Sequence, residues 1–96
     1  MSENPRAELE ALGHAGEIDL IARSPSGILC FVEVKAREDQ RSAVESVMPR
    51  QRERIQRAAQ IFVSGKPSLR DAAMRFDIVT VSPRALPRHI RGAWRP

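Results

Sequence analysis

The sequence predicts an α/β fold, a small mixed sheet of about four strands flanked by one main helix. Residues 28–32 form a continuous apolar run, which is typical of a central strand covered on both faces. Residues 17–21 alternate between charged and apolar side chains, as a half-buried strand does. After Pro49, apolar side chains recur at helical spacing. The 96 residues suffice for one domain, which we place at residues 16–96 behind a short segment, residues 1–15.

Both strand-forming runs carry charges at positions where a core strand is normally apolar. Glu33 and Lys35 end the apolar run and, being two residues apart, point to the same face of the sheet. Glu17 and Asp19 likewise share one face of the preceding run. The turn-forming residues 23–27 between the runs favour a hairpin, which would place Asp19 across from Glu33. We therefore expect three carboxylates and a lysine to converge on one patch.

Two interpretations account for charges in such a position. Burying a charge costs several kcal/mol unless the group is paired or bound to a cation. One interpretation is a buried Asp/Glu–Lys ion-pair network that holds the strands in register. The other is a Mg²⁺ or Mn²⁺ site, because hard divalent cations prefer carboxylate, carbonyl and water oxygens. Lys35 would then orient or help deprotonate a water molecule, or neutralise charge on a phosphorane-like transition state.

The second half of the chain supplies the helix and the remaining strands. A polar connection after Lys35 leads to a helical turn at residues 42–47, and Pro49 then opens a helix that runs to Ser64. Its buried stripe consists of Ile55, Ala58, Ala59 and Phe62. Residues 75–81 are rich in strand-forming side chains, and a right-handed crossover through the helix would place them parallel to the central strand. A turn of the chain at residues 69–73 and a short edge strand at residues 88–91 complete the prediction.

Charge is divided unevenly along the chain. Residues 1–40 hold four basic and eight acidic side chains, net −4, whereas residues 41–96 hold twelve basic and four acidic ones, net +8. The basic excess is almost entirely arginine, whose planar fork suits phosphate oxygens. A solvated charged surface is the simpler explanation, but the acidic group and the basic excess independently fit a phosphodiester, which favours nucleic acid. The residues that we assign to nucleic-acid binding are Arg37, Arg50, Gln51, Arg54 and Arg57.

The run Gly16-Glu-Ile-Asp-Leu-Ile21, followed after a short turn by Phe31-Val-Glu-Val-Lys35, resembles the signature of the YraN-like family of small bacterial proteins. That family belongs to the restriction-endonuclease-like superfamily, with its D…(D/E)-x-K metal site, and is similar to the archaeal Holliday junction resolvases. The likeness continues in short ordered matches and covers residues 16–94. It implies that Asp19 and Glu33 are metal ligands, that Val34 lends its main-chain carbonyl, that Lys35 is the catalytic lysine, and that Glu17 is an additional acidic group.

One departure from that family concerns the beginning of the domain. Its members usually start with a helix and a first strand, whereas only fifteen residues precede Gly16 here. Pro5 to Leu12 would form a short helix with Gly13 as its stop, which leaves no room for a strand. We therefore expect an N-terminally truncated sheet that lacks one strand, with the remaining edge either exposed or covered by another chain, as in a homodimer.

Other features exclude several classes of protein. Cys30 is the single cysteine and lies in the apolar run, so we expect an inert core thiol in a reducing cytoplasm, without an internal disulfide. His14 and His89 are too far apart in sequence to suggest a zinc motif, and we find neither a phosphate-binding glycine loop nor a nucleophile elbow. No apolar run is long enough for a membrane span, and the N-terminus lacks the pattern of a signal peptide. Trp94 is expected to close one end of the core.

Two functions of different classes remain. The first is a Mg²⁺- or Mn²⁺-dependent endonuclease that hydrolyses phosphodiester bonds of DNA, with branched or structured DNA as one substrate class. The second is a non-catalytic nucleic-acid-binding protein that retains the nuclease fold. Phosphate contacts predict a steep salt dependence of binding in both cases, so only a response to metal separates them.

Overall fold

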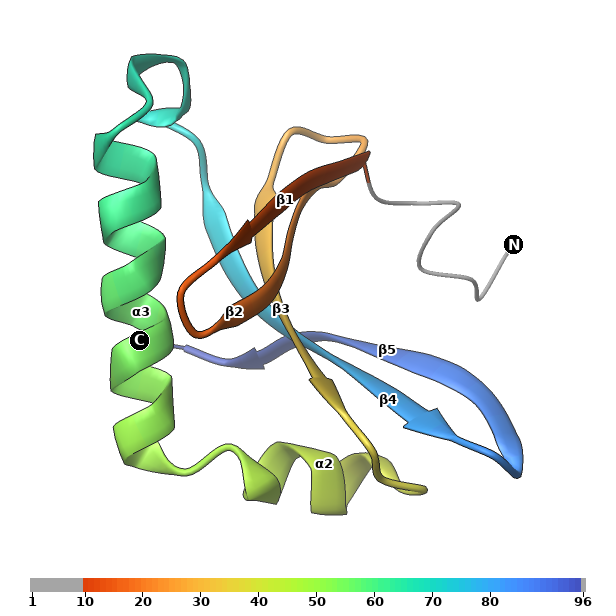
Figure 1. The fold of residues 1–96 in the computed structure, drawn as a ribbon. Helices are drawn as coiled ribbons and strands as arrows, with labels where there is room; N and C mark the ends of the chain where they lie inside the picture. Colours follow the sequence, from red (N-terminus) through yellow and green to blue (C-terminus); the bar gives the residue numbers. More distant parts are fainter. Residues whose placement is uncertain (1–9, 96) are drawn as a thin grey trace.

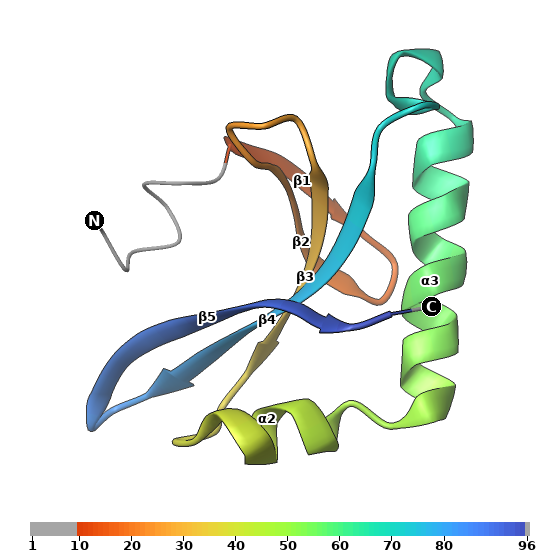
Figure 2. The same ribbon diagram turned by 180° about the vertical axis from the view of Figure 1, so that it is seen from behind.

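The computed structural model describes residues 10–95, which form one mixed sheet with two helices on one of its faces (Figures 1 and 2). The sheet has five strands in the order β1-β2-β3-β4-β5. Their bounds are β1 Glu10–Ala15, β2 Ile18–Arg23, β3 Leu29–Lys35, β4 Met74–Ser82 and β5 Ala85–Trp94. The central pair β3 and β4 is parallel, and the other neighbours are antiparallel. The predicted α/β class and the parallel crossover are thereby confirmed.

The crossover from β3 to β4 contains both α-helices. The first is α2, Gln40–Ser46, which begins where the Asp39 carboxylate accepts a 2.7 Å hydrogen bond from the Ser42 amide. The second is α3, Pro49–Ser64, with proline at its first position, where a missing N–H costs nothing. A 3₁₀ turn, η1 Pro67–Leu69, then leads into β4, so the turn predicted at residues 69–73 lies slightly earlier in the chain. None of the helices in residues 10–95 is long and apolar enough to cross a lipid bilayer.

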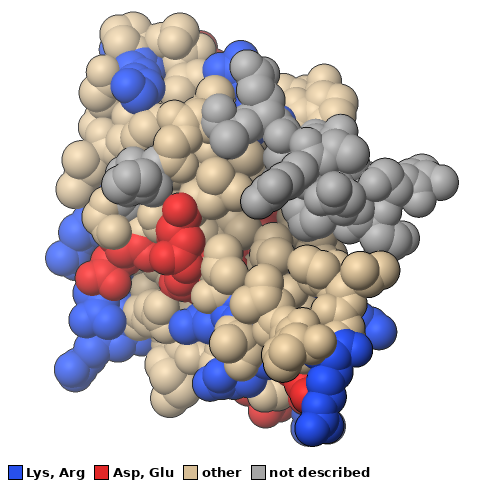
Figure 3. All heavy atoms as spheres, turned by 45° about the vertical axis from the view of Figure 1, so that its right-hand side comes forward, with Lys and Arg blue, Asp and Glu red and all other residues tan. Residues whose placement is uncertain are grey.

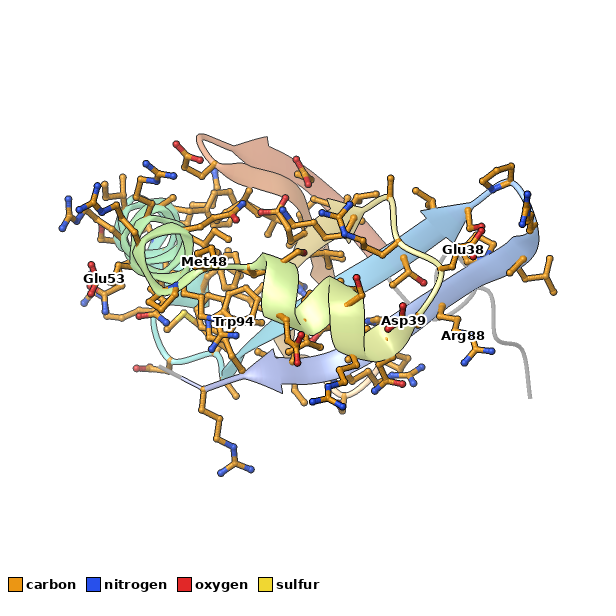
Figure 4. All side chains as sticks on the ribbon, turned by 90° about the horizontal axis from the view of Figure 1, so that it is seen from below. Glu38, Asp39, Met48, Glu53, Arg88 and Trp94 are labelled. Carbon is orange, nitrogen blue, oxygen red and sulfur yellow. The ribbon has the colours of Figure 1, made fainter. Side chains whose placement is uncertain are left out.

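The hydrophobic core lies between the sheet and α3. Phe31 of β3 packs edge-on against Phe62 of α3, with ring centroids 6.4 Å apart, and stacks on Phe76 of β4 at 5.6 Å. Phe76 in turn stacks on Trp94, 5.4 Å away, which comes from β5 and lies beside α3 (Figure 4). Burying each such side chain contributes about 1.5–3 kcal/mol. Trp94 is 6% exposed and closes this end of the core, as predicted.

The beginning of the sheet differs from the prediction. We expected a helix over Pro5–Leu12; residues 5–9 lie outside the described part of the chain, and residues 10–12 belong to β1 instead. β1 pairs antiparallel with β2, so the sheet has five strands rather than about four, and β2 is not an edge. Backbone pairing with β2 outweighs the local helix propensity of Glu-Ala-Leu. Within residues 10–95 the outer strands are β1 and β5, and pairing of an outer strand in a homodimer stays a prediction.

The last strand is longer than the short edge strand predicted at residues 88–91. β5 spans ten residues and includes Pro87. Proline is tolerated in an outer strand, where its missing N–H breaks no ladder, and the register shifts between the Thr80 and Ser82 pairs, next to Pro87. β4 and β5 therefore form a long hairpin whose far end carries the turn at Pro83 and Arg84.

Candidate functional site

Asp19 and Glu33 meet where the ladder between β2 and β3 ends. The last residues that the strands pair are Leu20 and Val32, and one more step in the same register brings Asp19 opposite Glu33. The Asp19 side chain continues the hydrogen bonding in place of the backbone, because its Oδ2 accepts a 2.8 Å hydrogen bond from the Val34 amide. The two carboxyl groups are close enough to share a hydrogen bond when one is protonated. The neighbourhood predicted from the alternating pattern and the hairpin is confirmed.

Glu33 is the buried member of the pair. Its side chain starts from the same face of the sheet as Phe31, the face that α3 covers, and the residue is only 6% exposed. Gln51, in the first turn of α3, donates a 2.8 Å hydrogen bond from Nε2 to Glu33 Oε2. α3 thus places a neutral donor, rather than a cation, against the buried carboxylate.

The surroundings move the pKa values of the two acids in opposite directions. Burial and the adjacent Asp19 carboxyl raise the pKa of Glu33 to about 7, although Lys35 and Gln51 favour its charged form. Burial also acts to raise the pKa of Asp19, but the hydrogen bonds with Glu33 and the Val34 amide, together with the charge of Lys35, leave that pKa below its usual value. Near neutral pH the pair therefore holds a proton easily, since one negative charge is much more stable there than two.

Lys35 follows Glu33 on the same face of β3 and is partly buried. Its charge favours the ionised form of both carboxyl groups, yet within the described part of the chain it makes no direct ion pair with either. The first interpretation of the charged pattern, a closed Asp/Glu–Lys ion-pair network, does not describe this arrangement. The Lys35 amine therefore lies near the carboxyl groups without forming a direct ion pair with either of them.

Glu17 does not join this pair. It lies in the turn before β2 because Gly16, at φ 54°, redirects the chain two residues before the strand begins at Ile18. Its half-exposed carboxylate lies 3.9 Å from Nε of Arg54 on α3. Among residues 10–95 no group of three or more acidic, histidine or cysteine side chains forms a metal-binding cluster. The structure therefore brings together two of the three expected carboxylates.

The donor set of the remaining pair fits a hard divalent cation. Two carboxylates together with water and phosphate oxygens are a common set of ligands for Mg²⁺ in proteins. The hydrogen bonds from the Val34 amide and Gln51 go to one oxygen of each carboxylate, Asp19 Oδ2 and Glu33 Oε2. Val34, whose carbonyl was predicted as a ligand, lies between Glu33 and Lys35 at the same strand end.

The predicted arginines stand on the exposed side of α3 and beyond β3. Arg50, Arg54 and Arg57 follow one another at helical spacing, all exposed, and the contact of Arg54 with Glu17 shows that this row lies beside the turn between β1 and β2. Arg37 is exposed after β3, where its Nη1 donates to the Ala36 carbonyl. Figure 3 shows an acidic patch with basic side chains beside and below it on one face of the molecule.

Arg52, also on α3, has a different environment. It donates hydrogen bonds to the carbonyl oxygens of Val47, at 2.8 Å, and Val44, at 3.4 Å. Its guanidinium lies 5.6 Å from the ring centroid of Trp94. Arg52 therefore ties α2 to the core, and it is not available to a ligand in the way that its neighbours are.

A second polar cluster occupies the opposite face of the sheet. Asp77 is fully buried and accepts hydrogen bonds from Arg75 at 2.8 and 2.9 Å, from His89 Nε2 at 2.7 Å and from the Gly92 amide at 2.9 Å. Arg75 also donates to Cys30, and burial raises the pKa of the Cys30 thiol to about 11. The predicted buried position of Cys30 is confirmed. The contribution of His89 was missed, because only the pairing of β4 with β5 brings it near.

Comparison with known proteins places the chain in a family. The model of the uncharacterised protein family UPF0102 matches residues 5–81, which include Asp19, Glu33, Lys35 and α3. The UPF0102 protein of Paramagnetospirillum magneticum is 51% identical over 81 residues, which are 84% of this chain and 62% of that protein. The UPF0102 protein of Parvibaculum lavamentivorans is 46% identical over 82 residues, 85% of this chain and 61% of the relative. For the UPF0102 protein of Maricaulis maris, the identity is 49% over 82 residues, 85% of this chain and 64% of the relative.

The chain thus spans about three fifths of the length of these curated relatives. The matched segments nevertheless cover more than four fifths of this chain. On these matches, the chain belongs to the YraN-like family UPF0102.

Proposed function

We propose that this chain carries the metal-dependent catalytic site of an endonuclease of the restriction-endonuclease-like type that hydrolyses DNA. The observation that carries the proposal is the meeting of Asp19 and Glu33 at the end of β2 and β3, with Lys35 on the same face. A buried carboxylate such as Glu33, beside a second carboxyl group and without a cationic side chain in direct contact, is costly when both groups are ionised. A divalent cation held by these carboxylates would offset that cost, and such cations also promote phosphodiester hydrolysis.

The chain's own residues would divide the work as follows. Asp19 and Glu33, with the main-chain carbonyl of Val34, would hold Mg²⁺ or Mn²⁺. When bound, such an ion supplies charge neutralisation at the phosphate and lowers the pKa of water. Lys35 would take a proton from the attacking water or stabilise negative charge on the phosphate oxygens, and Gln51 would keep Glu33 oriented. Arg37, Arg50, Arg54 and Arg57 would bind the neighbouring phosphates.

A non-catalytic nucleic-acid-binding protein is the second candidate. It is favoured by the fact that each carboxylate of the pair already accepts one protein N–H, from Val34 and from Gln51. In that case the carboxyl pair would serve the fold, and the arginines alone would serve function.

The first test measures whether a cation binds at the pair. Thermal unfolding of the wild type with added Mn²⁺ should show a gain in stability of about 2.7 kcal/mol when the free cation reaches about 100 times its Kd. Glu33→Gln should abolish this gain because it removes a ligand charge. At pH 8 without metal, the same variant should be more stable than the wild type. The raised pKa of Glu33 means that its contribution to stability is full below about pH 4.5 and is lost as pH rises through about 7.

The second test separates the two candidates. With Mn²⁺, the wild type should nick or cut a branched or nicked duplex, whereas Lys35→Ala should bind the same DNA with similar affinity and leave it intact. Binding of both metal and DNA without cleavage over a broad panel of structures would favour the non-catalytic protein. Absence of both the metal response and DNA binding would reject the two candidates together.

A further inference from the structure

We propose that the end of the β4–β5 hairpin, residues 82–88, is a second nucleic-acid contact, in which Arg84 and Arg88 bind phosphates and Leu86 rests against an exposed base. We call these residues the hairpin tip. The inference rests on the proposed function, because it extends the same substrate beyond the carboxyl pair. The UPF0102 model matches residues 5–81, so the hairpin tip lies beyond that matched segment.

The composition of the hairpin tip is unusual for a solvated turn. Leu86 is 84% exposed, the largest exposed fraction among the large hydrophobic side chains of the described residues. Arg84 and Arg88 lie on either side of Leu86, both exposed, and each directly follows a proline, which restricts the backbone there. The sequence contains no acidic residue after Asp77. The tip is therefore a rigid apolar point between two cations.

The hairpin tip also projects from the rest of the sheet. β3 ends at Lys35, which pairs with Thr80, so the hairpin beyond that point is a two-stranded ribbon, and it extends past the other strands in Figure 1. A groove of about 510 Å³ separates it from the start of α2, lined by Gln40 and residues 85–90. No carboxylate lines this groove. A polyanion that enters the groove would therefore meet no negatively charged side chain in its lining.

The strand register connects the tip to the candidate site. Lys35 pairs with Thr80, and Thr80 pairs with Arg88, so the three residues form one row across β3, β4 and β5. Paired residues point to the same face, and neighbouring strands lie about 4.8 Å apart, which places Arg88 roughly 10 Å from Lys35 along the row. One DNA strand carries a phosphate about every 3.4 Å of helix axis. A strand with a phosphate at Lys35 can therefore present another one to Arg88.

Two acidic residues, Glu38 and Asp39, follow Lys35 in the chain, and neither lines the groove. Glu38 and Asp39 lie on the loop before α2, and the Asp39 carboxylate is occupied by the Ser42 amide. In Figure 4, Arg88 extends outward from β5 at the same end of the molecule as this loop. Two-stranded ribbons fit the major groove, and apolar side chains flanked by cations are used to unstack bases. DNA with unpaired or unstacked bases is thus the form that Leu86 would contact best.

The experiment measures binding of fluorescein-labelled DNA by anisotropy, with Ca²⁺ in place of Mg²⁺, on a blunt duplex and on the same duplex with a short unpaired loop. Leu86→Ser should weaken binding of the looped DNA more than that of the blunt duplex. Arg84→Ala/Arg88→Ala should weaken both, by about fivefold or more per arginine, and should reduce the salt slope of log K by about 2. Arg70→Ala, an exposed arginine after η1, is the matched control and should bind like the wild type.

The outcomes separate this inference from the proposed function. If the tip variants bind both DNAs like the wild type while Arg50→Ala binds weakly, the inference is overturned and the proposed function stands. If the wild type binds neither DNA, both fall. If Leu86→Ser keeps its DNA affinity but loses binding to anionic phosphatidylserine vesicles, the tip belongs to a membrane contact, and the inference is again overturned. Because Leu86 is exposed, the variant is expected to unfold at the wild-type temperature, which thermal melting verifies.

Discussion

Glu33 and Asp77 are buried carboxylates of one sheet, but their partners differ. Asp77 receives hydrogen bonds from two nitrogens of Arg75, from His89 and from the Gly92 amide. Glu33 receives one from a neutral amide, and its other neighbour is a second carboxyl. The pKa of Glu33 is accordingly raised, whereas that of Asp77 is lowered. A fully satisfied acid stabilises the fold, while an acid left beside another acid is a candidate for chemistry.

Asp77→Asn tests whether the fully hydrogen-bonded carboxylate of Asp77 stabilises the fold. Burial acts to raise the pKa of Asp77, but the donors from His89, Arg75 and Gly92 lower it below 3.8. Its contribution to stability is therefore present above about pH 4 and is lost as pH falls through the folded-state pKa. At pH 7 the variant should lose about 3–5 kcal/mol, since Arg75 is left without its buried partner. Urea unfolding measured between pH 2 and pH 7 checks both statements.

The control for that substitution is Asp71→Asn, at an exposed aspartate between η1 and β4. It should unfold like the wild type at every pH. If Asp77→Asn keeps wild-type stability, or if the acid limb of the wild-type curve is unchanged by it, the cluster around Asp77 contributes little and the contrast with Glu33 loses its meaning.

The sequence predicts single residues of the site only as far as local periodicity reaches. Asp19 and Glu33 follow from strand alternation and one turn, and both were placed correctly relative to each other. Glu17 follows the same alternation, but the positive φ of Gly16 places Glu17 in the turn between β1 and β2 rather than in a strand. The contact of Gln51 with Glu33 depends on how α3 packs on the sheet, which no local pattern encodes. Gln51 could be singled out only by its place in the first turn.

At the scale of elements, strong local signals were sufficient where they existed. α3 has the predicted bounds, Pro49–Ser64, because proline opens it, Gly65 and Pro67 follow it, and its apolar stripe is continuous. β1 was missed because Glu10, Ala11 and Leu12 favour a helix, and only the backbone of β2 makes them a strand. Long-range pairing likewise extends β5 through Pro87 beyond the predicted strand.

Two arginines in the first turn of α3 allow a matched test of what the helix does. Arg50→Ala should leave thermal stability unchanged but weaken DNA binding by about fivefold, since Arg50 is exposed and is proposed to bind one phosphate. Arg52→Ala should instead lower stability by about 1–3 kcal/mol, because it removes the hydrogen bonds to Val47 and Val44 and the contact with Trp94. Melting curves and anisotropy titrations on both variants provide the measurements. A reversed pattern would mean that the exposed row of α3 is structural and not a DNA contact.

At the scale of the whole molecule, the uneven charge of the sequence becomes a spatial arrangement. The acidic first half provides the carboxyl pair at the end of β2 and β3, and the basic second half provides the arginine row of α3 and the hairpin tip. The row on α3 lies beside the turn between β1 and β2, and the row Lys35–Thr80–Arg88 runs from β3 across β4 to β5. Basic side chains thus lie around the acidic carboxyl pair. This suits a polyanion that binds together with a cation.

This arrangement predicts the salt dependence of DNA binding by the intact chain. Arg37, Arg50, Arg57, Arg84 and Arg88 are proposed to bind phosphates and make no direct ion pair within residues 10–95. If each neutralises one phosphate, log K should fall with log[salt] with a slope of roughly −4 to −5, from about −0.9 per contact. Anisotropy titrations on one duplex between low and physiological salt, in Ca²⁺, measure the slope. Asp19→Asn/Glu33→Gln should keep that slope in EDTA, because the carboxyl pair makes no phosphate contact without a cation. A slope near zero for the wild type would show that its basic surface is merely solvated, and it would remove the ground on which a nucleic-acid substrate is proposed.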